Sequence, residues 1–152
     1  MLKQGLLDGV TIAVAGDDAC AAEAAALGAQ VAALVPAGDD TAVDTVPDVV
    51  VCSTDGVDAA FDATRAVANA WIAGERSGKV ILVAPRDDGP QRAALESLAR
   101  TLSVEWARYG ITAVVILPGT AEDVAQLVAF LASPAGDYFS GTALDLGSAL
   151  SP

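Results

Sequence analysis

Histidine is absent from this chain of 152 residues, and basic residues are scarce. Eight Lys and Arg stand against 20 Asp and Glu, which gives a formal net charge of −12. Without histidine there is no Ser/His/Asp or Cys/His catalysis, no imidazole metal ligand and no histidine pH switch. A surface of this charge repels the phosphate backbone of nucleic acids. The composition therefore excludes many hydrolases and predicts a protein that does not bind nucleic acid.

Cysteine and long apolar runs are also lacking. Cys20 and Cys52 are too few and too far apart for a disulfide framework, and neither has partners at metal-ligand spacing. We expect both to be small core residues, and we expect no metal site. The first residues hold no secretory apolar stretch, and no run of 18 residues is free of charge and turn signals. These absences predict a cytoplasmic protein that does not enter a membrane.

Apolar residues nevertheless make up 53% of the chain, and they occur in a regular order. Short β-branched runs alternate with longer Ala- and Leu-rich segments of helical period, which is typical of a parallel sheet covered by helices on both faces. We expect strands at residues 10–15, 30–35, 48–52, 79–84, 111–117 and 142–146. We expect helices at residues 19–27, 57–75, 90–109 and 122–132. The pattern predicts an α/β protein, a doubly wound three-layer sandwich with a parallel sheet of about six strands.

Two long segments carry a resemblance to a known family. Residues 92–119 read RAALESLARTLSVEWARYGITAVVILPG, and residues 127–147 read LVAFLASPAGDYFSGTALDLG. The first resembles the helix-plus-strand core of the short-chain dehydrogenases/reductases, and the second is similar to the closing block of that family. Residues 7–16 and 27–31 are weaker matches. The resemblance implies a single Rossmann-like domain over residues 1–152, truncated because family members are usually longer.

The glycine-rich turn that the family uses for its nucleotide cofactor is missing. Residues 15–20 read Ala-Gly-Asp-Asp-Ala-Cys, so that Gly16 alone remains of the turn, and Asp17 and Asp18 stand where phosphate would lie. Carboxylates repel phosphate, so the site near Gly16, Asp17 and Ser53 is degenerate and we expect no NAD or NADP. We interpret the two aspartates as helix-capping residues; a phosphate site bridged by a cation is the alternative.

The polar residues 53–55 stand where the family has its N-N-A-G stretch, which lines the nucleotide cleft. We expect them to cap the following helix, because Ser, Thr and Asp are preferred N-cap residues. A polar cluster that binds a ligand is the alternative. The position after the second strand, which normally selects the cofactor, is Pro36, and Asp39 and Asp40 further along are interpreted as solvated loop charges.

The catalytic residues that the resemblance implies are replaced as well. Asp88 aligns with the family's tyrosine and Arg92 with its lysine. A carboxylate has no proton to give at neutral pH, and the fixed charge of Arg92 would pair with an acid such as Asp88. Residues 83–85, near the position of the family's serine, carry no hydroxyl. We therefore expect no catalytic residue, and we expect Tyr109 and Tyr138 to pack at a helix end and in the last loop.

The segments that remain are those through which the family assembles. The resemblance implies that residues 57–75 and 90–109 form a four-helix bundle between subunits, and that residues 122–132 and 142–146 form a second dimer contact. The expected outward residues of the long helix are small or pairable: Ala94, Thr101, Glu105 and Arg108. The sequence thus predicts a catalytically inactive relative that acts as an oligomerising or partner subunit, either with itself or with an active homologue.

Two alternatives stay open at this point. One is a minimal NAD- or NADP-dependent oxidoreductase that reduces a 3-oxoacyl thioester or a similar carbonyl compound, using residues not yet identified or a site completed by a partner. The other is a small-ligand binder at the carboxyl edge of the sheet near Gly16, Ser53 and Pro85, where ligands of α/β sheets bind.

Overall fold

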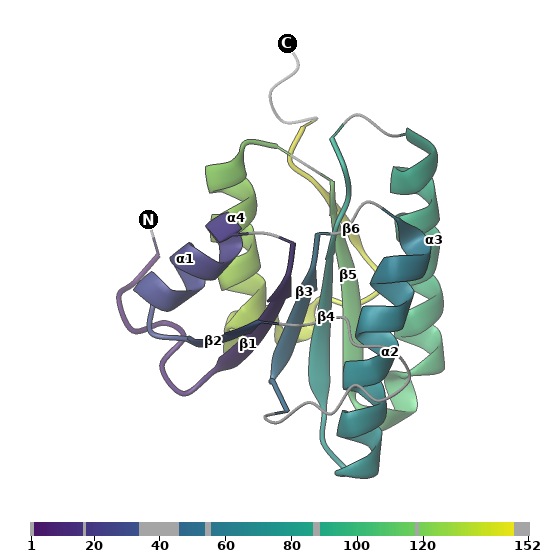
Figure 1. Cartoon of the computed structure of the whole chain (residues 1–152), viewed down its shortest axis with the longest axis horizontal. Helices are drawn as coiled ribbons and strands as arrows, with labels where there is room; N and C mark the ends of the chain where they lie inside the picture. The colour runs from purple at the N-terminus through teal and green to yellow at the C-terminus, as the bar shows by residue number, and fades with distance from the viewer. Residues whose placement is uncertain are drawn as a thin grey trace.

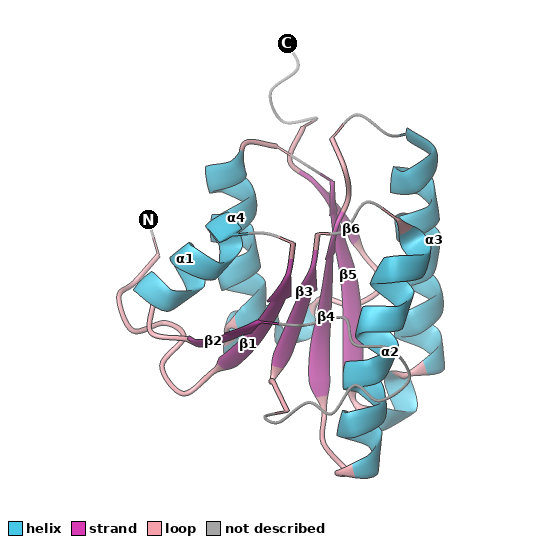
Figure 2. Cartoon of the chain, in the orientation of Figure 1, coloured by secondary structure: helices cyan, strands magenta, loops and turns pink. Residues whose placement is uncertain are grey.

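A sheet of six parallel strands forms the centre of the protein (Figures 1 and 2). The computed structural model describes residues 2–16, 18–33, 46–53, 56–86, 89–117 and 119–147. The strands are β1 (Thr11–Ala15), β2 (Gln30–Ala33), β3 (Val49–Cys52), β4 (Gly78–Val83), β5 (Ile111–Leu117) and β6 (Ala143–Asp145). Their order in the sheet is β2-β1-β3-β4-β5-β6, so the direction of winding reverses between β1 and β3.

Four helices cover the two faces of this sheet. They are α1 (Asp18–Ala26), α2 (Val57–Ala73), α3 (Gly89–Glu105) and α4 (Ala121–Ala132), joined by the 3₁₀ helices η1 (Ala107–Tyr109) and η2 (Pro134–Tyr138). Figure 1 shows α1 and α4 on one face and α2 and α3 on the other. The prediction of a doubly wound, Rossmann-like three-layer sandwich is confirmed.

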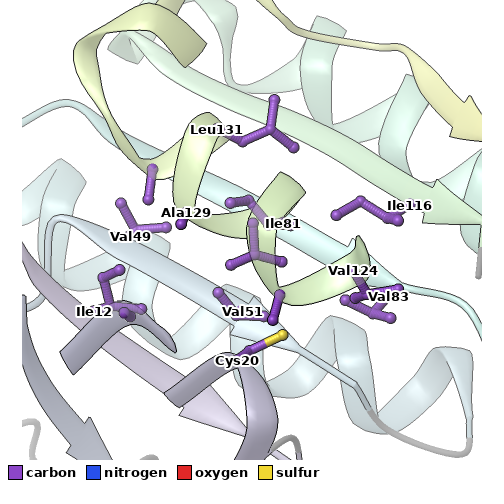
Figure 3. Close-up of a cluster of buried hydrophobic side chains, with 14 of the residues drawn as sticks. Ile12, Cys20, Val49, Val51, Ile81, Val83, Ile116, Val124, Ala129 and Leu131 are labelled. Carbon is purple, nitrogen blue, oxygen red and sulfur yellow. The ribbon is translucent and has the colours of Figure 1, made fainter. Parts of the chain in front are cut away.

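The central strand β3 shows why the sequence folds this way. All four of its residues are buried, because both faces of a central parallel strand are covered by helices. Val49 and Val51 contact the layer of α1 and α4 together with Ile81 (Figure 3). Val50 and Cys52 contact the layer of α2 and α3. Burial of each such aliphatic side chain contributes about 1.5–3 kcal/mol.

Trp71 fixes α2 against the sheet. Its side chain is fully buried, and its indole Nε1 donates a hydrogen bond of 2.6 Å to the carbonyl oxygen of Pro47. Gly78 at the start of β4 lies directly against the ring, and a Cβ at this position would overlap it. The glycine is therefore required by the close approach of the strand to the indole.

The longest predicted helix is shorter than expected. It spans Gly89–Glu105 and not residues 90–109, because the chain tightens into η1 after Trp106, whose φ is −103° and ψ is 1°. Gly110 then adopts a left-handed conformation with φ +74°, and its N–H donates to the carbonyl oxygen of Ala107. The three-and-four spacing of apolar residues continues through this turn, so periodicity alone did not reveal the break.

The remaining differences are small. Helix α2 ends at Ala73, two residues before the expected end, and β6 has only three residues. The second strand is described as far as Ala33, and the expected positions 34 and 35 lie outside the described residues, as do Pro36, Asp39 and Asp40. None of the described helices is long and apolar enough to cross a membrane.

Candidate functional site

The carboxyl ends of β1 and β3 lie side by side at the point where the winding of the sheet reverses. Open α/β sheets bind their ligands at this point. The backbone N–H of Ser53 donates to the carbonyl oxygen of Ala15 at 2.9 Å, so Gly16 and Ser53 are brought together as predicted. The other predicted members of the degenerate site, Asp17 and residues 54–55, lie outside the described residues.

Gly16 has a structural reason to be glycine. Its φ is +83°, a region that side chains rarely adopt, and a Cβ on it would overlap the carbonyl oxygen of Ser53. The chain leaves β1 so close to the end of β3 that no side chain fits between them. The single glycine that remains of the phosphate-binding turn is therefore explained by the backbone, without a ligand.

The N-terminus of α2 has a side-chain partner in α3, Gln91, that the sequence did not predict. Its N-cap residue is Gly56, which has no side chain to cap the helix. The N–H of Val57 instead donates to Oε1 of Gln91 in α3, at 3.2 Å. A helix N-terminus supplies unsatisfied N–H groups to an anionic ligand. In this protein one of these groups is bonded to a neighbouring helix.

The catalytic positions of the resemblance lie along the end of β4 and the start of α3. Val83 and Ala84 are buried, Pro85 is half-buried, and none of these three residues carries a hydroxyl. Arg92 lies near the start of α3 and is half-buried. Asp88 lies outside the described residues, so the expected pair between Asp88 and Arg92 stays a prediction.

Arg86 is a second basic group at this edge that the sequence did not single out. Its guanidinium donates a hydrogen bond to the carbonyl oxygen of Gly119. This contact joins the turn after β4 to the turn after β5. Arg86 therefore links two turns at the edge where a substrate would lie.

Every tyrosine and every lysine of the chain lies away from the carboxyl edge. The sequence contains only Tyr109, Tyr138, Lys3 and Lys79 of these two types. Tyr109 follows α3 and precedes β5, Lys79 is the second residue of β4, and Tyr138 ends η2 after α4. Lys3 begins a turn near the end of α1. In this turn the N–H of Leu7 donates to the carbonyl oxygen of Leu27, just after that helix. All four positions are at the amino edge of the sheet.

The tyrosine and lysine side chains cannot reach the carboxyl edge of the sheet, because the helices span a longer distance than a side chain. α3 has 17 residues, and a rise of about 1.5 Å per residue makes it about 25 Å long. Tyr109 is half-buried with the Arg108 guanidinium 4.7 Å from its ring centroid, as expected of packing at a helix end. The expectation that Tyr138 packs in the last loop is wrong, because its side chain is 92% exposed.

The thiol nearest to the candidate site is not a nucleophile. Cys52 precedes Ser53 and is buried, and this burial raises the pKa of the thiol from 9.0 to about 12. The group therefore stays protonated at neutral pH. Cys20 is also buried and neither cysteine forms a disulfide, which confirms both as core residues. Within the described parts of the chain, no group of three or more acidic or cysteine side chains is placed to hold a metal ion.

Known proteins resemble this chain in structure. No protein-family model matches the chain, and no curated protein sequence matches it. Its structure is similar to a "Putative oxidoreductase from Escherichia coli str. K-12", with a TM-score of 0.70 and 17% identity over 90% of this chain and 94% of that chain. It is also similar to a short-chain dehydrogenase from Bacillus anthracis str. 'Ames Ancestor', with a TM-score of 0.59 and 21% identity. That match covers 69% of this chain and 66% of the Bacillus chain.

These likenesses define the class of fold. The protein has the α/β fold of the short-chain dehydrogenases/reductases, as the resemblance of residues 92–119 and 127–147 implied. At these identities the likeness concerns the fold, and the activity has to be argued from the site.

Proposed function

We propose that this chain is a catalytically inactive protein of the short-chain dehydrogenase fold that acts as an oligomerising or partner subunit. The partner is a second copy or an active protein of the same fold. The proposal includes a cytoplasmic location and no NAD or NADP cofactor.

The observation that carries the proposal is the position of the tyrosines and lysines. Reduction of a carbonyl group in this fold needs a proton donor next to the substrate, and the resemblance assigns that role to a tyrosine assisted by a lysine. Here all four such side chains lie at the amino edge. The described part of the carboxyl edge offers the guanidiniums of Arg86 and Arg92, the hydroxyl of Ser53 and a thiol with a raised pKa at Cys52, and it includes neither a tyrosine nor a lysine.

The first surface proposed for assembly is the outer side of α2 and α3, which we call the helix-pair face. These two helices contact each other and cover the same face of the sheet (Figure 1). Exposed residues of these helices include the small Ala59, Ala73, Ser97, Thr101 and Val104, among charged residues such as Asp62, Arg65 and Arg100. Of the outward residues expected on the long helix, Thr101 and Glu105 of α3 and Arg108 of η1 are exposed, and Ala94 is half-buried. Small side chains let two helices approach closely.

Val104 is an unusual residue for a helix face that is exposed only to solvent. Its side chain is 75% exposed, although valine has a low preference for exposed helix positions. Thr101 and Glu105 lie beside it along the same side of α3. Packing Val104 against a partner would remove this apolar side chain from water.

The second surface is the free side of β6, which we call the β6 edge. β6 pairs with β5, and no other described strand lies beyond it. Leu144 and Leu146 are half-buried there, and Tyr138, which ends η2 before this strand, is exposed. Exposed aromatic residues such as this tyrosine are enriched in contact patches.

The test is the oligomeric state of the full chain and of two variants, measured by sedimentation velocity over a range of concentrations. We expect the wild type to self-associate, and more strongly at high salt, because copies of charge −12 repel each other. Val104→Asp should weaken association through the helix-pair face at least tenfold, about 1.4 kcal/mol. Tyr138→Asp, at a residue that is 92% exposed, tests the second surface in the same way, so the two variants separate the contributions of the two surfaces.

Association with an active homologue is tested on the same variants. If the wild type is a monomer, it is used to capture proteins from its native cell, and a protein of the same fold should be retained by the wild type and lost with Val104→Asp. A monomer that captures no such protein contradicts the partner role. Turnover of NADPH with a 3-oxoacyl thioester by the chain alone would contradict its inactivity, whereas turnover only after mixing with the captured protein supports the complex.

A further inference from the structure

A pocket of about 410 Å³ opens at the amino edge of the sheet, opposite the edge discussed above. It lies on the face that α4 covers, because α4 ends at Ala132 and the chain then turns into η2. The side chains that line it come from neighbouring strands on one side and from the end of α4 and η2 on the other: Val10, Val49, Lys79, Thr112, Ala132, Pro134 and Asp137. Val49, Lys79 and Thr112 are direct neighbours in the register of β3, β4 and β5.

The charged groups of this pocket are already paired inside the protein. The Lys79 ammonium donates to the carbonyl oxygens of Leu131 at 3.1 Å and Ser133 at 2.7 Å, and it lies 2.5 Å from Oδ1 of Asp137. An ammonium has three protons, so these contacts use all of them. The Lys79 side chain is 17% exposed, which limits its access to a ligand.

Asp48 at the rim is paired in the same way. One carboxylate oxygen accepts from the Arg76 guanidinium at 2.7 Å, and the other accepts from the backbone N–H of Thr11 at 2.9 Å. Each charged side chain of the lining therefore has its counter-ion inside the protein, and a charged ligand would meet no unpaired opposite charge. The pocket therefore favours a neutral ligand.

The hydrogen-bonding groups left over are hydroxyls and one carboxylate oxygen. Within the described residues, neither the Thr112 hydroxyl nor the Ser77 hydroxyl at the rim makes a hydrogen bond to another group. Asp137 uses one oxygen for Lys79, and its side chain is 60% exposed, so the second oxygen can accept from a ligand. Val10, Val49 and Pro134 supply apolar walls between these groups.

We propose that this pocket binds a neutral polyhydroxylated molecule, a sugar or a comparable polyol. Neighbouring hydroxyls of such a molecule donate to the free oxygen of Asp137 and exchange hydrogen bonds with Thr112, while its C–H faces pack on Val10 and Pro134. A volume of about 410 Å³ is within the usual range of small-molecule pockets, roughly 300–1,000 Å³. This site does not depend on the proposed partner role, because it lies on the face of the sheet that α4 covers, opposite the helix-pair face.

The experiment is a titration of the ¹⁵N-labelled full chain with D-glucose and with D-ribose, followed by amide chemical shifts. We expect saturable shifts at Gly78, Lys79, Gly110 and Thr112, and none at Gly16. Thr112→Val, which removes one hydroxyl at nearly constant volume, should weaken binding about fivefold. Thr11→Val is the matched control at the same edge: the alternation of β1 places this side chain on the opposite face from Ile12, so affinity should be unchanged.

Several results would overturn this proposal. They are the absence of saturable shifts with both sugars, an affinity unchanged by Thr112→Val, and shifts at the same amides with putrescine or inorganic phosphate but not with the sugars. If Thr112→Val does not fold by circular dichroism, Ser77→Ala at the exposed rim takes its place, and the same weakening is expected.

Discussion

Replacing Gly16 by alanine separates two reasons for the one glycine retained at the carboxyl end of β1. If the glycine is needed because the backbone of Gly16 passes close to the carbonyl oxygen of Ser53, the substitution destabilises the protein whether or not a ligand is present. Gly16 has a φ of +83°, and its Cβ would overlap the carbonyl oxygen of Ser53. The N–H of Ser53 is bonded to the carbonyl oxygen of Ala15, which holds Ser53 beside the end of β1.

The magnitude follows from two separable costs. A left-handed conformation costs an alanine about 1–2 kcal/mol. Displacing the end of β1 or β3 to relieve the overlap costs about 1–3 kcal/mol more, as for other overpacked sites. Gly9 provides the matched control, since its φ is +81° and nothing lies within 4 Å of a Cβ there. Gly9→Ala should therefore show only the first cost.

The assay is urea unfolding followed by tryptophan fluorescence, which reports on the fully buried Trp71. The two variants are compared with the wild type at constant m-value, and we expect Gly16→Ala to lose at least 1 kcal/mol more than Gly9→Ala. Equal losses would refute the steric argument and would leave a ligand as the reason for this glycine.

Two further predictions concern single groups. The pKa of Cys52 is raised to about 12 in the folded protein, so its contribution to stability is complete below pH 9 and is lost as the pH rises toward 12. We expect the free energy of unfolding to fall by about 1 kcal/mol between pH 9 and 10 on this account, and urea unfolding of Cys52→Ala should lack that part of the decrease. Lys79→Met removes the charged donor from the end of α4 and should cost about 1–3 kcal/mol in the same assay, whereas Lys3→Met in an exposed turn should stay within about 0.5 kcal/mol. Similar losses for both lysine variants would contradict the role given to Lys79.

Most of the fold was predictable because its signals are local and repeated. The β-branched run of β3 is buried on both faces, which is what an uninterrupted apolar run predicts for a central parallel strand. Gly110 ends the long helix segment with a positive φ, as a glycine after a helix commonly does. Gly28 ends α1 in the same way, with φ +105°.

The parts that sequence reasoning missed depend on contacts between distant segments. Gln91 binds the N–H of Val57 across two helices, and nothing in the local sequence of either segment reports that contact. The exposure of Tyr138 depends on how η2 turns away from the sheet, whereas an aromatic residue in an apolar context predicts burial. The pocket beside Lys79 is lined by residues from the strand starts, the end of α4 and η2, and these residues are separated by up to 127 positions, between Val10 and Asp137.

The expectation of a degenerate nucleotide site depends on residue types that are missing from the sequence. Asp88 and Arg92 stand where the resemblance places a tyrosine and a lysine, and this substitution is visible without coordinates. The structure adds that no other tyrosine or lysine of the chain takes their place at that edge.

The central claim is that the carboxyl edge beside Gly16 and Ser53 binds no dinucleotide. The most direct test is a fluorescence titration of the pure, folded chain with NADH and with NADPH. We predict no saturable change in the fluorescence of either cofactor. Saturable binding at micromolar concentration would contradict the account.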